Sequence, residues 1–313
     1  MKGIFESRSA GVKILILLLL VVVSVCVGSI CLTIFSAISG VEFGDLASDF
    51  YQTHANFLVS DIFTFIAPAL VMAYLCSRQP RNFLSIRKVT DFRIILLSIV
   101  MFVLIIPTIN LTEYLNSRVH LPEFMAPIED YMKQNDKDVG EIIQNLISEK
   151  GVIPLIINFF TIAVMAGLSE ELFFRGILLS IIGGKKRNQH AAIWIVALIF
   201  SAIHLQFDGF VPRMLLGAFL GYLLLWGRSI LIPMFAHFLN NAMNVVFLYC
   251  GFPGDSSEGA TLMGEEVTST DLWTMGLSAS AGLILFYFCA KAMKRIASPP
   301  LPSPQLPPSS PLP

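Results

Sequence analysis

The sequence predicts an all-α fold: a polytopic membrane helix bundle of about eight transmembrane helices, with both termini in the cytoplasm. Of the 313 residues, 55% are hydrophobic and 14% are charged, and the mean hydropathy is +0.73. A soluble domain is usually about 45–50% apolar and about 25% charged. This composition excludes an ordinary soluble domain and predicts an integral, multi-pass protein of the plasma (inner) membrane.

Apolar windows of about 20 residues, the length that crosses roughly 30 Å of hydrocarbon, locate the predicted spans. The eight windows are residues 12–36, 57–76, 93–113, 152–182, 191–207, 210–226, 229–250 and 273–293. The long segment 114–150 between the third and fourth windows is acidic and polar. Apolar residues at helical spacing in 139–147 predict an interfacial or capping helix there.

The distribution of Lys and Arg predicts the orientation of these spans, because cytoplasmic loops carry the excess of positive charge. One side receives 15 of the 21 basic residues, whereas the loops 37–56 and 251–272 contain none. The 15 residues are Lys2, Arg8, Lys13, Arg78, Arg81, Arg87, Lys88, Arg93, Lys185, Lys186, Arg187, Arg228, Lys291, Lys294 and Arg295. We therefore expect both termini in the cytoplasm.

The chain divides into four predicted parts. Residues 1–150 contain the first three spans and the acidic outer loop, residues 151–250 contain a polar cluster within four spans, and residues 251–297 contain an outer loop and the last span. The proline-rich segment 298–313 is predicted to be a disordered cytoplasmic tail. The sequence has no Gly-rich phosphate loop and no basic aromatic patch, so nucleic-acid binding is not predicted.

The stretch SEELFFRG in the fourth span places Glu170, Glu171 and Arg175 within hydrocarbon. Charged groups at this depth cost roughly 2.5–3.5 kcal/mol each, so they usually face a protein interior or a water-filled cavity. Glu171 and Arg175 are four residues apart and are predicted to pair. Glu170 is turned about 100° away on the same helix, so it has no local partner. A structural ion-pair cluster is the alternative interpretation.

Two further polar pairs lie in neighbouring spans. Phe200 and His204 in the fifth span, and His237 and Asn241 in the seventh, are each four residues apart and share a helix face. Counting 1.5 Å per residue from the helix ends places Glu170, His204, His237 and Asn241 at depths of about 12–20 Å. We therefore expect these side chains to converge on one cavity.

This set of groups predicts amide hydrolysis. An unpaired carboxylate can take a proton from water as general base and return it to a leaving amine. The imidazoles and the carboxamide supply either ligands for a metal that acidifies water or hydrogen-bond donors for an oxyanion.

The ordered motifs E-E-x-x-x-R, F-x-x-x-H and H-x-x-x-N resemble the signature of the CAAX prenyl protease and bacteriocin-processing (CPBP, or Abi) family. The resemblance covers about residues 150–250 and implies that 151–250 is a catalytic membrane core of an intramembrane endopeptidase. Glu170 would be the water-activating glutamate, supported by the pair Glu171 and Arg175. The other site residues implied by the resemblance are His204, His237, Asn241 and Phe200. The substrate would be a peptide or lipidated protein that enters from the cytoplasm or laterally from the lipid bilayer.

Two questions stay open at the level of sequence. His204 and His237 could bind Zn²⁺ with a carboxylate as third ligand, but the chain lacks H-E-x-x-H, and a metal-free glutamate mechanism fits the same residues equally well. A non-catalytic bacteriocin-immunity or membrane scaffold protein could also keep this fold. A proton-coupled transporter is a further alternative, although the sequence shows no internal repeat.

Overall fold

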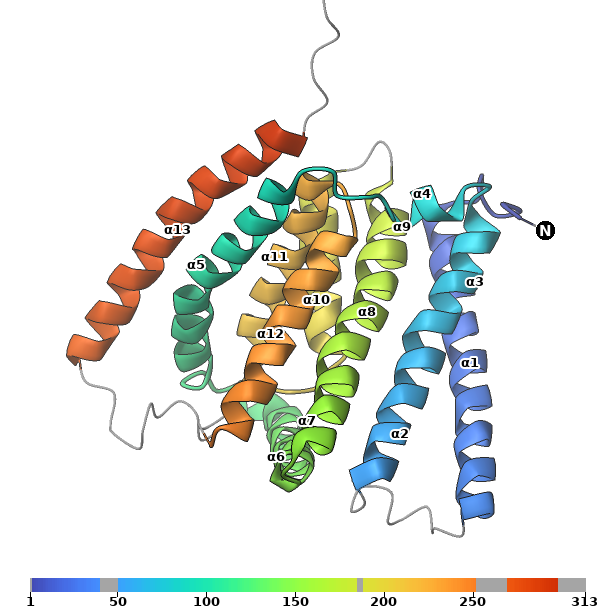
Figure 1. Ribbon diagram of the computed structural model, residues 1–313, viewed down its shortest axis with the longest axis horizontal. Helices are drawn as coiled ribbons and strands as arrows, with labels where there is room; N and C mark the ends of the chain where they lie inside the picture. The colour runs from blue at the N-terminus through green and yellow to red at the C-terminus, as the bar shows by residue number, and fades with distance from the viewer. Residues whose placement is uncertain (1, 40–49, 185–187, 252–268, 298–313) are drawn as a thin grey trace, which may run out of the picture.

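The computed structural model describes residues 2–39, 50–184, 188–251 and 269–297, which form helices and turns without a β-strand. Most of the helices stand side by side in one bundle (Figure 1). Within these residues, seven helical stretches are long and apolar enough to cross a membrane. The predicted polytopic all-α bundle is confirmed. The proline-rich tail and most of the predicted loop 251–272 lie outside the described residues.

The first three spans surround the central helices on two sides (Figure 1). They are α1 (Ala10–Ser39), the continuous run of α2 (Phe50–Ser60), η2 (Asp61–Ile66) and α3 (Ala67–Cys76), and α5 (Phe92–Asn116), with the short helix α4 (Pro80–Phe83) before α5. α1 packs against the second span, whereas α5 packs along the last helix, α13 (Ser269–Ala297). The side chain of Asp91 caps α5 by accepting a hydrogen bond from the amide of Arg93 at 2.9 Å.

The central helices carry the predicted polar cluster. The fourth span is the run of α7 (Val152–Asn158), η4 (Phe159–Met165), α8 (Ala166–Glu171), η5 (Leu172–Leu178) and α9 (Leu179–Gly183), and it is followed by α10 (Gln189–Ala202), α11 (Phe210–Gly227) and α12 (Leu231–Tyr249). Both η4 and η5 are π-helical, so α8 lies between two stretches of wider turn. Such π-helical stretches occur frequently at functional sites.

The predicted fifth span, 191–207, is wrong at its C-terminal end. α10 has 14 residues, or about 21 Å of helix, and is shorter than the roughly 30 Å of hydrocarbon. The chain leaves the helix after Ala202, passes through Leu205 with a φ of 52°, and turns back into α11 at Phe210. The polar residues Gln206, Asp208 and Gly209 follow directly and favour this turn.

The two faces of the bundle differ in charge. We call one end the basic face: it contains the start of α1, residues 77–91, the end of α9, Arg228 and the end of α13 (Figure 1). The described chain enters and leaves the bundle at this same face, because the seven long stretches and the short α10 make eight passages through it. That this face is cytoplasmic stays a prediction.

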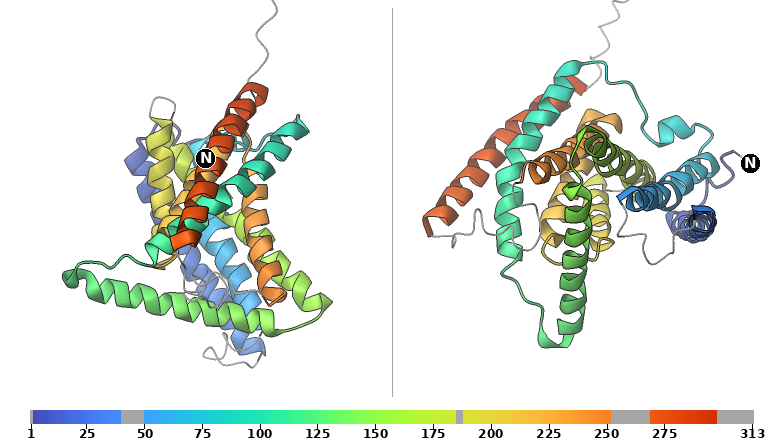
Figure 2. Two further views of the ribbon diagram at one scale, coloured as in Figure 1. Left: turned by 90° about the vertical axis from the view of Figure 1, so that its left-hand side faces the viewer. Right: turned by 60° about the horizontal axis from the view of Figure 1, so that its bottom comes forward.

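The opposite face is covered by α6 (Ala126–Ser148), which follows the short 3₁₀-helix η3 (Glu123–Met125). α6 runs across the ends of the other helices rather than alongside them (Figure 2). It packs against α7 and α12 and buries Leu146 and Ile147. The helix expected within 139–147 is thus present, as part of a longer helix that covers this end of the bundle.

Candidate active site

Glu171 and Arg175 form the buried ion pair that their spacing predicts. Arg175 Nη1 donates to Glu171 Oε1 at 2.6 Å, and the two side chains are 1% and 0% exposed. Arg175 Nη2 donates to the carbonyl oxygen of Gly217 at 2.8 Å, and its guanidinium lies 4.7 Å from the centre of the Phe200 ring. The pair therefore joins the fourth span to α10 and α11.

Glu171 also orients His237, which lies on α12. His237 Nδ1 is 3.0 Å from Glu171 Oε1. Because the carboxylate can only accept, Nδ1 carries the hydrogen and Nε2 is left for other contacts. Gly167 allows α12 to come this near, since a Cβ atom there would lie 3.0 Å from the amide nitrogen of Phe238.

Glu170 differs from Glu171 in its surroundings. Its carboxylate is 15% exposed, and its Oε2 lies 3.8 Å from His237 Nε2, beyond hydrogen-bonding distance. It lines a cavity of about 540 Å³ together with His204, His237 and Asn241. The structure thus brings four of the predicted side chains, from two helices and a turn, to one cavity. Phe200 forms part of its wall.

Asn241 can donate one further hydrogen bond from its side chain. Its Nδ2 donates to the carbonyl oxygen of Ile162 at 3.1 Å, and its Oδ1 accepts from Asn240 Nδ2 at 3.1 Å. A carboxamide nitrogen carries two hydrogens, so the second N–H remains available to a group in the cavity.

His204 is held in the turn between α10 and α11 rather than on a helix. Its Nδ1 lies 2.8 Å from the carbonyl oxygen of Phe200, so Nδ1 is the protonated nitrogen and Nε2 is an acceptor in the neutral ring. The rings of Phe200 and His204 also contact each other edge to face at 5.1 Å. The i and i+4 relation therefore holds in space although the helix has ended.

Side chains from α5 and α6 bind the backbone of this turn. Asp136 accepts from the amides of Phe207 and Asp208 at 2.8 and 3.2 Å. Asn135 donates to the carbonyl oxygen of His204 at 3.0 Å, and Asn116 to that of Phe207 at 2.7 Å. Irregular backbone within a membrane is tolerated where protein satisfies its polar groups. α6 thereby fixes the position of His204.

We expect Asp136→Ala to loosen the turn that carries His204, because two backbone N–H groups lose their acceptor. Each such loss costs roughly 1–3 kcal/mol. Hydrogen exchange of residues 203–209 should become faster. Asp138→Ala is the matched control, since Asp138 lies on the same helix and bonds to exposed Gln134. Equal exchange in both variants would contradict a role for Asp136.

Asp61 and Arg213 are among the charged residues of the cavity that the sequence did not predict. Asp61, the first residue of η2, accepts a hydrogen bond from Ser169 Oγ at 3.1 Å and lines the cavity beside Glu170. Arg213 on α11 lines it as well and donates to Gln206 Oε1 at 2.6 Å. Both lie inside windows counted as spans, where any ionisable residue signals a functional site by default. That signal was present in the sequence.

The cavity extends toward α6 and not toward the basic face. Its lining includes Glu113 and Ser117 near the end of α5, Asp136 on α6, and Asn244 in the second half of α12. Among the described residues, none from the segments at the basic face lines it. Entry of substrate from the cytoplasm or laterally from the lipid bilayer stays a prediction.

The cavity residues supply only part of the ligand set that a metal ion needs. Within the described part of the chain, no three His, Cys, Asp or Glu side chains are grouped so that they could hold a metal. His204 and His237 each have Nδ1 engaged and Nε2 left over, which is the usual state of zinc-binding histidines. Two imidazoles without a third ligand do not make a closed site.

The sequence of the central helices is similar to a known protein family. Residues 152–243 match the family model described as "Type II CAAX prenyl endopeptidase Rce1-like". Residues 152–243 are similar to this family, and we call them the Rce1-like core. The resemblance seen in the three motifs is thereby confirmed, and the Rce1-like core includes Glu170, His204, His237 and Asn241.

Two further comparisons bear on the whole chain. The uncharacterized protein YpbD of Bacillus subtilis (strain 168) is 30% identical over 110 residues, which are 34% of this chain and 51% of YpbD. The chain thus spans about half the length of this curated relative. No solved structure matches the chain.

Asp61 lies outside the Rce1-like core, so the cavity combines core residues with one from an earlier span.

Proposed function

We propose that the protein is an intramembrane endopeptidase that hydrolyses a peptide bond in a membrane-associated or lipidated substrate. The observation that carries this proposal is the contrast between two adjacent glutamates. Glu171 is bonded to Arg175 at 2.6 Å, whereas Glu170 faces the cavity and lies 3.8 Å from His237, beyond hydrogen-bonding distance. A carboxylate free to exchange protons is what a general base requires. The description of the matching family supports the same activity.

The residues suggest a complete proton cycle. Glu170 removes a proton from a water whose oxygen forms a bond to the substrate carbonyl carbon, and His204 Nε2 accepts a hydrogen bond from the hydroxyl group that remains on that oxygen. The oxyanion receives a hydrogen bond from Asn241 and from the Nε2–H of protonated His237, whose charge is balanced by Glu171. The C–N bond then breaks, and Glu170 returns its proton to the amine nitrogen. The products are an amine and a carboxylic acid, which releases its remaining proton to water and becomes a carboxylate.

Metal-assisted hydrolysis is the alternative route at the same residues. His204 and His237 would hold a zinc ion through their Nε2 atoms, and the ion would polarise the carbonyl and acidify water. We favour the metal-free route because no third ligand is grouped with the two histidines in the described residues.

The decisive experiment is cleavage of a mixed library of isoprenylated and unmodified peptides by the purified full chain in lipid, with products read by mass spectrometry. A chelator arm separates the two routes. Cleavage that persists in chelator supports the metal-free route, and cleavage lost in chelator and restored by zinc supports the metal route. Absence of cleavage across the library would count against the peptidase and favour the non-catalytic immunity or scaffold alternative.

Asp61 is proposed as a second proton carrier of the cavity. We expect Asp61→Asn to lower kcat about tenfold or more, because a carboxyl group that can exchange protons near Glu170 is lost while the acceptor for Ser169 is kept. Thermal stability should stay near wild type. Ser60→Ala, an adjacent residue that also lines the cavity, is the control. Wild-type kcat in Asp61→Asn would exclude a catalytic part for Asp61.

A further inference from the structure

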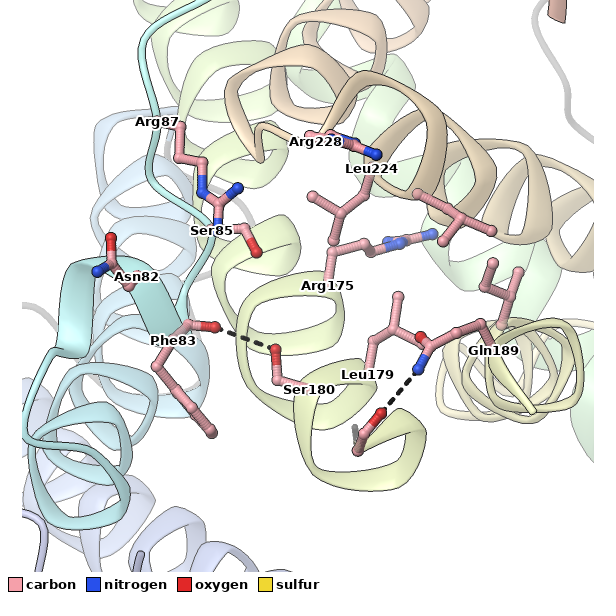
Figure 3. Close-up of a pocket in the computed structure, with 13 residues that line it drawn as sticks. Asn82, Phe83, Ser85, Arg87, Arg175, Leu179, Ser180, Gln189, Leu224 and Arg228 are labelled. Atoms are coloured by element: carbon pink, nitrogen blue, oxygen red, sulfur yellow. Dashed lines mark hydrogen bonds between the residues drawn. The ribbon is translucent and has the colours of Figure 1, made fainter. Parts of the chain in front are cut away.

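A second pocket lies at the basic face, apart from the cavity of the active site (Figure 3). Its volume is about 490 Å³, and its polar lining includes Ser85, Arg87, Arg175, Ser180, Gln189 and Arg228. No Asp or Glu is among the residues that line it. Arg175 is paired with Glu171, so the guanidinium groups of Arg87 and Arg228 are the ones that no carboxylate of the lining neutralises.

Two hydrogen bonds join the walls of this pocket. The amide of Ile230 donates to the carbonyl oxygen of Ser85 at 3.0 Å, and Ser229 Oγ donates to the carbonyl oxygen of Arg87 at 2.6 Å. Residues 85–87 are thereby fixed to the turn between α11 and α12. This contact places Arg87 and Arg228 on the same pocket, and Figure 3 shows them at the same side of it.

The backbone of the pocket is strained at two positions. Ser85 has a φ of 56° and Arg228 a φ of 59°, and the only other described non-glycine residue with positive φ is Leu205, beside His204. Left-handed conformations of such residues cost roughly 1–3 kcal/mol and persist at ligand clamps and active sites. One of the three flanks the active-site histidine, and two flank the arginine pocket.

The two exposed arginines are available to a ligand. The side chains of Arg87 and Arg228 are exposed, and neither makes a salt bridge within the described residues. Deeper in the pocket, the buried Nε of Arg175 has no hydrogen-bond partner among these residues. Guanidinium groups present a planar set of N–H donors that matches the oxygens of a phosphate.

We propose that this pocket binds a phosphate group of an anionic ligand, held between the guanidinium groups of Arg87 and Arg228. Its position at the end of the helices on the basic face matches the depth of lipid headgroups, and basic pockets between membrane helices bind such headgroups. A soluble phosphate ester offers the same chemistry. This proposal is independent of the peptidase activity, because the pocket contains none of the proposed proton-transfer groups.

The test is ligand-dependent thermal unfolding of the purified full chain in detergent, titrated with phosphatidylglycerol, with diacylglycerol, which lacks phosphate, and with inorganic phosphate. A ligand that binds the folded state raises the unfolding temperature. We compare wild type with Arg87→Gln/Arg228→Asn, in which Asn tolerates the left-handed backbone. The matched control is Arg81→Gln/Lys88→Gln, which removes two exposed charges from the same connecting segment outside the pocket.

We expect phosphatidylglycerol, and not diacylglycerol, to stabilise wild type and control. The apparent Kd should rise about tenfold or more in Arg87→Gln/Arg228→Asn, since charge-assisted hydrogen bonds are lost. Stabilisation by inorganic phosphate with the same variant dependence would identify a soluble phosphate ligand, and stabilisation by the lipid alone a headgroup. No stabilisation by either, or equal stabilisation of all three proteins, overturns the proposal. If the double variant does not fold, Arg87→Gln against Arg81→Gln gives the same comparison.

Discussion

Glu170→Gln should lower kcat for peptide cleavage by about 10²–10⁴-fold, the usual contribution of a general acid–base group. The amide keeps the shape of the side chain but cannot take a proton from water. Folding should be nearly unaffected, because the nearest ionic group, His237 Nε2, lies 3.8 Å away and makes no hydrogen bond to Glu170. Steady-state cleavage and thermal unfolding of the same preparation measure both expectations.

The control for this substitution is Glu141→Gln, which removes an exposed carboxylate from α6. It should change neither kcat nor the unfolding temperature. If Glu170→Gln cleaves as fast as wild type, the base is another group and the proposed mechanism is wrong. If Glu170→Gln loses both folding and activity, the carboxylate has a structural part that its contacts do not show.

Arg175→Ala should destabilise the protein by roughly 3–5 kcal/mol, because it leaves Glu171 charged and buried without its partner. The loss includes the bond from Nη2 to the carbonyl oxygen of Gly217 and the contact with the Phe200 ring. Glu171→Ala should be comparably destabilising. Reversible unfolding in mixed micelles gives the free energy of unfolding of each variant.

A matched ion pair on α6 provides the control. Glu129 and Lys133 have the same i, i+4 spacing and a distance of 2.7 Å, but the Lys133 side chain is 35% exposed. Lys133→Ala should therefore change the free energy of unfolding by about 1 kcal/mol or less. Equal effects of Arg175→Ala and Lys133→Ala would show that burial does not strengthen the Glu171–Arg175 pair.

The sequence predicted those features that depend on spacing along one helix. The pairing of Glu171 with Arg175, and the different surroundings of Glu170, follow from 3.6 residues per turn. The convergence of Glu170, His204 and His237 followed from depth alone, since helix rise is nearly constant. Spacing and depth along a helix depend only on nearby sequence, so the composition and the motifs were sufficient to predict these features.

Features that depend on contacts between distant segments were not predicted. The turn after Ala202 exists because Asn116, Asn135 and Asp136, from 60 or more positions earlier in the chain, satisfy its backbone. Asp61 was missed because its window was judged by mean hydropathy, which a single carboxylate hardly changes. The direction in which the cavity extends depends on where α6 lies, and an amphipathic pattern does not specify that.

The short α10 makes the membrane boundary uneven. Trp194, Ile195 and Leu198 are 41–47% exposed along α10, yet this helix offers about 21 Å of length, against about 27 Å or more for each of the seven crossing stretches. An apolar helix shorter than the hydrocarbon thickness creates hydrophobic mismatch, which a bilayer can relieve by thinning locally. We therefore expect the bilayer to be thinner next to α10, with water closer to His204 there than around the rest of the bundle. For the proposed peptidase, a substrate peptide bond would then reach His204 without crossing a full leaflet of hydrocarbon.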